Sequence, residues 1–307
     1  MTYKNAFVYT LILYIASVIT SSIIPIIGDI LLFIISVINQ IIKDIFPFFE
    51  MNSFSALFKN FSLLDLTYHI GMFFLFYIYI KKKKIPFSFS FNKMSSLRNY
   101  PLYFIAIGSM ILFYSFISFY IFNVIPDVVK SNKELDFFIS LNKELARRMT
   151  ILDRNKISFF ISSVFLVPIL EELVFRGFIL KELLRKKSHA IKPILFSSFL
   201  FGFIHFNPIQ PLGSVFMGII LGIILSTIYY QNKSILDCII LHSFHNIIGF
   251  FLMINPNKGQ IIGGQIKHLP LLASFILLII SIFSTYVIYQ KGLKKEKSIL
   301  KSNLNSI

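Results

Sequence analysis

The chain has 307 residues, of which 56% are hydrophobic and only 14% are charged, and its formal net charge is +16. Soluble domains usually carry about 25% charged residues, so these values exclude a soluble globular enzyme and a disordered chain. The single cysteine, Cys238, excludes a disulfide scaffold.

Long apolar stretches predict an all-α fold, a polytopic transmembrane helical bundle of about eight spans, because each span needs about 20 apolar residues. The stretch 30–49 is also apolar, but charged residues and a proline interrupt it, and we interpret it as an interfacial or re-entrant segment. The expected spans are roughly residues 6–27, 61–80, 101–123, 158–180, 190–207, 212–230, 234–253 and 269–289.

Lys and Arg are distributed unevenly between these spans, with clusters at residues 81–84 and 185–187. With the N-terminus inside, the inside segments hold more of them than the outside segments, which predicts that both termini are cytoplasmic. A nucleic-acid binder would spread its basic residues over a polar face. We therefore expect contact with the lipid bilayer and no nucleic acid as a partner.

Ionisable side chains inside membrane spans are costly, so each one suggests a function. The first group lies in the span 158–180, where Glu172 and Arg176 are four residues apart and can pair on one helix face. Glu171 points about 100° away from Glu172, and its burial suits it to act as a general base. Pro168 is expected to kink this helix. The alternative for this group alone is a buried ion pair that stabilises helix packing.

Two further polar groups follow in later spans. Phe201 and His205 are four residues apart, although a lone histidine in an apolar stretch is more often a hydrogen-bonded packing residue. His242 and Asn246 share a helix face, while His245 is expected to face elsewhere; the alternative is a polar clamp between helices. Together the three groups supply a base, imidazoles, an amide and a guanidinium, which suit water activation and oxyanion stabilisation.

If the helices are straight, His205 lies near the outer end of its span and His242 lies nearer the inner end of its own. The rise of a helix then predicts a difference in depth on the order of 10 Å. Tilted or broken helices would have to remove this difference if both imidazoles serve one site.

The order Glu-Glu-x-x-x-Arg, Phe-x-x-x-His and His-x-x-x-Asn resembles the motifs of the CAAX prenyl protease and bacteriocin-processing (CPBP, Abi) family of intramembrane proteases, over roughly residues 155–255. The resemblance implies an intramembrane endopeptidase that cleaves a membrane-associated protein or peptide. It divides the chain into an N-terminal transmembrane region of unknown role (1–150), a protease core (151–290) and a polar cytoplasmic tail (291–307).

The resemblance also implies roles for individual side chains. Glu171 and His205 would activate a water molecule, and His242 and Asn246 would stabilise the oxyanion. Glu172 and Arg176 would orient the other groups. We expect no cofactor. Glu171, His205 and His242 are, however, side-chain types that can bind zinc with water as the fourth ligand, so a divalent metal is kept as an alternative.

A catalytically silent membrane scaffold or bacteriocin-immunity protein of the same fold is the alternative function. Such a protein would be expected to lack a motif residue, and none is missing. A transporter is disfavoured, because the spans of the first half carry almost no charge. The abundance of Ile, Lys, Asn and Phe indicates an AT-rich genome, and we therefore expect a bacterial cytoplasmic membrane. No residue predicts the substrate.

Overall fold

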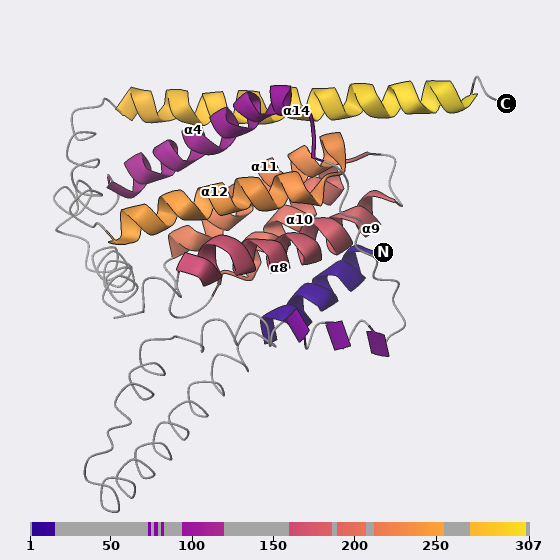
Figure 1. Cartoon of the computed structure of the whole chain (residues 1–307), viewed down its shortest axis with the longest axis horizontal. Helices are drawn as coiled ribbons and strands as arrows, with labels where there is room; N and C mark the ends of the chain where they lie inside the picture. Colours follow the sequence, from indigo (N-terminus) through magenta and orange to yellow (C-terminus); the bar gives the residue numbers. More distant parts are fainter. Residues whose placement is uncertain are drawn as a thin grey trace, which may run out of the picture. The chain divides into compact units, whose positions relative to one another are not determined.

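Helices make up nearly all of the described part of this chain, which contains no β-strand, so the predicted all-α class is confirmed (Figure 1). The computed structural model describes residues 2–15, 73–74, 77–78, 81–82, 94–119, 160–185, 189–206, 212–254 and 271–304. Residues 3–15 are helical. The further α-helices are α4 (Tyr100–Phe119), α8 (Val167–Val174), α9 (Lys181–Leu184), α10 (Ile191–Phe203), α11 (Leu212–Asn232), α12 (Ile235–Ile254) and α14 (Leu271–Leu304).

Two of the described helices are long and apolar enough to cross a membrane, judged by length and composition, at Gly213–Asn232 and Ser274–Ser302. The apolar helices Ile191–Phe203 and Ile235–Phe251 are shorter. The segment 30–49 and most of the expected spans 6–27 and 61–80 lie outside the described residues. A bundle of about eight spans therefore stays a prediction.

The chain divides into two compact units by its internal contacts. Every side chain of the three motifs lies in the first unit, so the site can be described within one body. Unit 1 comprises Met1–Ala6, Ser88–Leu152 and Glu171–Ile307, and unit 2 comprises Phe7–Phe87 and Asp153–Leu170.

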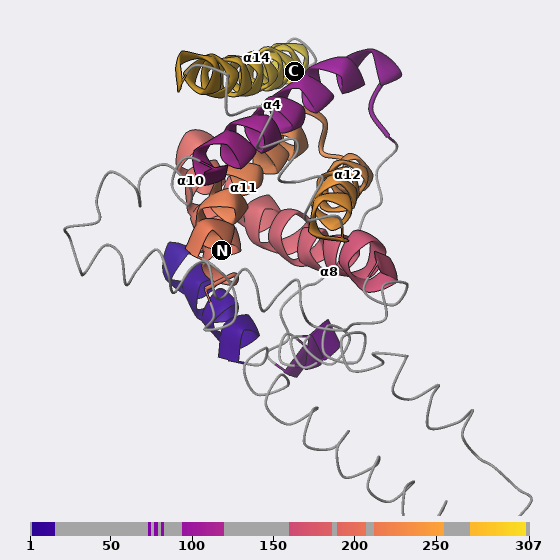
Figure 2. The same ribbon diagram turned by 90° about the vertical axis from the view of Figure 1, so that its left-hand side faces the viewer.

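In unit 1, α4 lies alongside α14 in both ribbon views (Figures 1 and 2). The Ser281 hydroxyl of α14 donates a hydrogen bond of 2.9 Å to the carbonyl oxygen of Ala106 in α4. Phe104 of α4 meets Phe244 of α12 edge to face, with 4.8 Å between the ring centroids. A helix from the predicted N-terminal region thus supports α12. The functional division of the chain near residues 150 and 290 stays a prediction.

The helix α14 runs without a break from Leu271 to Leu304. Residues 291–304 of the predicted polar tail form the C-terminal part of this helix, and the cytoplasmic location of the tail stays a prediction. Its sequence is rich in Lys, Leu and Ile and contains no proline, so nothing in it stops a helix. The Tyr230 hydroxyl of α11 donates a hydrogen bond to the Glu296 carboxylate and ties this half of α14 to unit 1.

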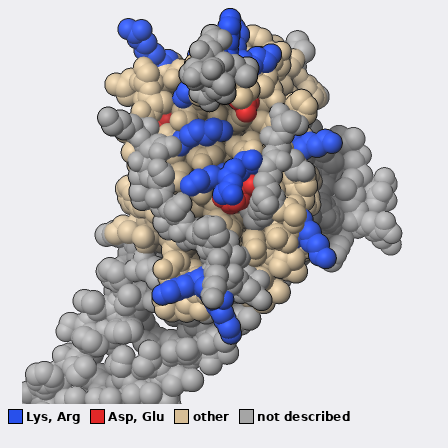
Figure 3. All heavy atoms as spheres, turned by 90° about the vertical axis from the view of Figure 1, so that its right-hand side faces the viewer, with Lys and Arg blue, Asp and Glu red and all other residues tan. Residues whose placement is uncertain are grey.

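Figure 3 shows several Lys and Arg side chains on the face that it presents. The exposed lysines of unit 1 include Lys192 at the start of α10, Lys233 in the turn between α11 and α12, and Lys294 and Lys295 of α14. The start of α10 and the end of α11 lie at the same end of the bundle, since these neighbouring helices run in opposite directions. This clustering agrees with the basic loops expected on the cytoplasmic side, while the orientation itself stays a prediction.

The helices α10 and α11 pack closely along a row of small residues, with Ser198 and Gly202 facing Gly218 and Gly222. A Cβ atom placed on Gly222 would lie 3.0 Å from the Cα atom of Ser198. One placed on Gly202 would lie 2.7 Å from the carbonyl oxygen of Val215. At Gly202 the backbone atoms are too close for a side chain, whereas at Gly222 a side chain would require Ser198 to shift by a few tenths of an ångström.

Replacing Gly202 by Ala should lower the free energy of unfolding by about 1–3 kcal/mol, because the added methyl group forces α10 and α11 apart. Thermal unfolding of the detergent-solubilised protein measures the effect. Gly249→Ala is the matched control, since a Cβ atom there meets no described atom within 4 Å. That control should be neutral or stabilising by up to about 1 kcal/mol. Equal melting temperatures for the two variants would contradict the close packing.

Candidate active site

The acidic motif lies where the regular helical pattern is interrupted on both sides. Glu171 and Glu172 are on α8, which the π-helical segment η3 (Ser162–Leu166) precedes and the π-helical segment η4 (Phe175–Leu180) follows. Pro168 cannot donate a helical hydrogen bond, which is consistent with the wider turns just before it. Short π-helical segments inside helices often occur at functional sites.

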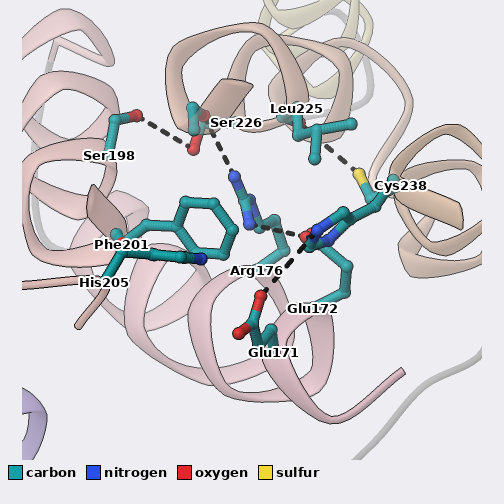
Figure 4. Close-up of polar contacts among 11 residues, drawn as sticks. Glu171, Glu172, Arg176, Ser198, Phe201, His205, Leu225, Ser226 and Cys238 are labelled. Atoms are coloured by element: carbon teal, nitrogen blue, oxygen red, sulfur yellow. Dashed lines mark hydrogen bonds and ion pairs between the residues drawn. The ribbon is translucent and has the colours of Figure 1, made fainter. Parts of the chain in front are cut away.

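Glu172 and Arg176 form the ion pair that their spacing predicts. Arg176 Nη1 lies 2.7 Å from Glu172 Oε1, and both side chains are fully buried (Figure 4). Arg176 Nη2 also donates a hydrogen bond of 3.1 Å to the carbonyl oxygen of Gly222, and its guanidinium carbon lies 4.5 Å from the centre of the Phe201 ring. The motif arginine therefore links the acidic motif to both α10 and α11.

His242 of α12 contacts both glutamates. Its Nδ1 lies 2.9 Å from Glu172 Oε1, and its Nε2 lies 3.8 Å from Glu171 Oε2. Because a carboxylate accepts hydrogen bonds, Nδ1 carries the hydrogen and donates it to Glu172. The same Glu172 oxygen thus accepts from His242 and Arg176, and the Nε2 atom of His242 is directed toward Glu171. The first and third motifs form one buried polar network.

This network has unused hydrogen-bonding capacity at its centre. Glu171 Oε2, Glu172 Oε2 and Arg176 Nε are buried and have no hydrogen-bond partner among the described residues. Buried polar atoms without partners are rare and costly, and each one calls for an explanation. In Glu171 the oxygen without a hydrogen-bond partner, Oε2, faces the imidazole of His242. A carboxylate and an imidazole in this arrangement can bind a small polar reactant such as water.

His205 lies in the turn just after α10, and its ring folds back along the helix. Its Nδ1 is 2.9 Å from the carbonyl oxygen of Phe201. The Phe201 ring lies 5.3 Å from the His205 ring and 5.6 Å from the His242 ring, so both imidazoles share this neighbour despite the difference in depth expected from straight helices. Gly218 provides space, because a Cβ atom there would lie 3.2 Å from His205 Nδ1.

The sequence predicts that Glu171 and His205 act together on one water molecule. Among the described residues no ion pair joins these two side chains, and the imidazole that contacts Glu171 is that of His242, whose Nε2 atom lies 3.8 Å from Glu171 Oε2. Whether Glu171 and His205 contact the same water molecule stays a prediction.

Asn246 and His245 are joined side chain to side chain, since His245 Nδ1 lies 2.9 Å from Asn246 Oδ1. The His245 ring also lies 6.5 Å from the His242 ring. His245 is expected to face elsewhere than His242 and Asn246, yet its side chain contacts Asn246. Residues three apart on a helix are neighbours as well as residues four apart, and this spacing was the available signal.

The residues do not form a ready-made metal site. Within the described part of the chain, no group of three or more His, Cys, Asp and Glu side chains could hold a metal ion. The Nδ1 atoms of His205 and His242 are each engaged, by a backbone carbonyl oxygen and by Glu172 respectively, which leaves Nε2 of each ring as the nitrogen that could bind a metal. Because Glu171, His205 and His242 do not gather into such a group, this set does not fit a zinc ion as it stands, and a metal-free reaction stays a prediction.

The apolar helices indicate an integral membrane protein, and its buried polar network joins carboxylates to an imidazole. Residues 153–248 match the family model Rce1-like, described as Type II CAAX prenyl endopeptidase Rce1-like. The matched residues contain all three motifs, and the match confirms the predicted resemblance to the CAAX prenyl protease family. No curated protein and no solved structure matches the chain.

Proposed function

We propose that this chain is an intramembrane endopeptidase that hydrolyses a peptide bond of a membrane-associated protein or peptide. The observation that carries the proposal is the buried network in which one imidazole, that of His242, contacts both Glu171 and Glu172. The family match over the same helices supports the reaction class. Hydrolysis within a bilayer requires a polar site among apolar helices, which these residues would provide.

In the proposed reaction Glu171 is the general base. It takes a proton from water, and the resulting hydroxide attacks the carbonyl carbon of the scissile bond. Glu171 passes this proton to Nε2 of His205, and the C–N bond of the tetrahedral intermediate breaks as the amine nitrogen receives the proton from His205. The hydroxyl group of the water molecule is then part of the new carboxylic acid and its other proton is on the new amine, so both side chains regain their starting states.

His242 and Asn246 are the proposed donors to the oxyanion of the tetrahedral intermediate. When both ring nitrogens of His242 carry hydrogen, Nδ1 donates to Glu172 and Nε2 can donate to the oxyanion. Glu172 and Arg176 act by orienting this ring. Removal of one oxyanion donor in a buried site typically costs roughly 10²–10³ in kcat.

The test is cleavage of a membrane-inserted peptide with a fluorophore and a quencher on either side of the scissile region. The purified protein in proteoliposomes should cleave the peptide, whereas protein-free vesicles should not. A silent scaffold or immunity protein would give no cleavage for any member of a panel of such peptides, and that result would overturn the proposal. The panel includes prenylated and unprenylated sequences, because the substrate class is part of the question.

The same assay tests the metal-free route. Because no described set of ligands is ready to hold a metal, a chelator such as 1,10-phenanthroline should leave the initial rate within about two-fold of the untreated value. Loss of activity that added Zn²⁺ restores would contradict a metal-free reaction while leaving the protease assignment intact.

A further inference from the structure

α12 also carries His245, a histidine that belongs to none of the three motifs. Its Nδ1 lies 2.9 Å from Asn246 Oδ1, and its ring lies 6.5 Å from that of His242. The neighbouring residue Phe244 packs edge to face against Phe104 of α4. This contact fixes how α12 is turned about its own axis. His245 is therefore a fixed neighbour of Asn246.

In the observed arrangement the oxygen of the Asn246 amide faces Nδ1 of His245. The Oδ1 atom of an asparagine is only an acceptor, so His245 Nδ1 must be the donor in the observed arrangement. A rotation of the amide by 180° would bring its NH₂ group against the N–H group of the imidazole, and the hydrogen bond would be lost. The donor thus sets which side of the Asn246 amide presents oxygen and which side presents NH₂.

We propose that His245 is a positioning residue for Asn246. Its Nδ1–H group holds the amide oxygen, so that the NH₂ group has the fixed orientation that an oxyanion donor requires. The inference rests on the proposed function, in which Asn246 stabilises the tetrahedral intermediate. It adds a residue outside the three motifs, and it assigns a specific ring nitrogen to the task.

Two amide substitutions separate the ring nitrogens of His245. In His245→Asn the side-chain NH₂ group can occupy roughly the place of Nδ1, whereas in His245→Gln it can reach roughly the place of Nε2. We expect His245→Asn to keep kcat within about three-fold of the wild type. His245→Gln should lower kcat about ten-fold or more with little change in KM, because an oxyanion donor acts mainly in the transition state.

The control is His189→Gln, the same substitution at an exposed histidine outside the helices, which should change neither kinetic constant. Adding His245→Gln to Asn246→Ala should cause no further loss, because both changes remove one function. Thermal unfolding of each variant identifies any variant that fails to fold, and the Asn and Gln variants should melt at similar temperatures.

Three outcomes would overturn the inference. The first is a wild-type kcat in His245→Gln, and the second is an equal loss in the Asn and Gln variants. The third is an additive loss in the double variant. A wild-type protein without cleavage activity would refute the proposed function itself, so the two failures are distinguishable.

Discussion

Replacing Glu171 by Gln should abolish measurable cleavage while the protein stays folded. Gln has nearly the same shape and can still make polar contacts with His242, whose Nε2 lies 3.8 Å from the carboxylate. It cannot accept a proton from water, and the loss of a general base typically costs roughly 10²–10⁴ in rate. The measurement is kcat on the quenched membrane peptide, together with the melting temperature of the variant.

The matched control is Glu182→Gln on α9, where the carboxylate pairs with the exposed Arg185 at 3.5 Å. Its rate should stay within about two-fold of the wild type, because it does not touch the site. A Glu171→Gln variant that kept more than about a tenth of the activity would rule out Glu171 as the base.

The two imidazoles can be compared in the same assay. A large loss in His205→Ala supports its assignment as the proton carrier. A near-normal rate in His205→Ala, combined with a large loss in His242→Ala, would instead make His242 the partner of Glu171, since His242 is the imidazole in contact with it.

Replacing Arg176 by Met should lower the free energy of unfolding by about 3–5 kcal/mol, the cost typical of breaking a buried ion pair on one side. The change leaves the fully buried Glu172 without its cation and removes the donor to the carbonyl oxygen of Gly222. It also removes the cation–π contact between the guanidinium and the Phe201 ring. Thermal or chemical unfolding in detergent micelles measures the effect.

Arg185→Met is the control, because its side chain is 67% exposed and its pair with Glu182 is 3.5 Å long. This change should cost less than about 1 kcal/mol. Replacing Glu172 by Leu in the Arg176→Met background should recover part of the stability, since no lone charge is then buried. Equal destabilisation by the two arginine substitutions would mean that burial of the Arg176 pair has no energetic importance.

The sequence by itself determined two helices in the second half of the chain and the ion pair between two side chains of one helix. The predicted spans 212–230 and 234–253 correspond to Leu212–Asn232 and Ile235–Ile254. The ion pair of Glu172 and Arg176 followed from their spacing. These features are local, because the apolar stretches and the four-residue period of a helix are written in consecutive residues.

The boundary of α14 could not be read from the sequence in the same way. A change from apolar to polar residues near Lys291 predicts the end of a membrane span, yet the helix continues to Leu304. Polar and apolar residues such as Lys and Leu have similar helix propensities, so a change in polarity marks a change of solvent and not the end of a helix.

Only the tertiary structure decided how the site is assembled. It brought His242 against both glutamates, joined His245 to Asn246, and made the carbonyl oxygen of Gly222 an acceptor for Arg176. These contacts depend on the depth and rotation of each helix relative to its neighbours. Both are set by long-range packing, such as the close approach of α10 and α11 through glycines, which no spacing within a single helix encodes.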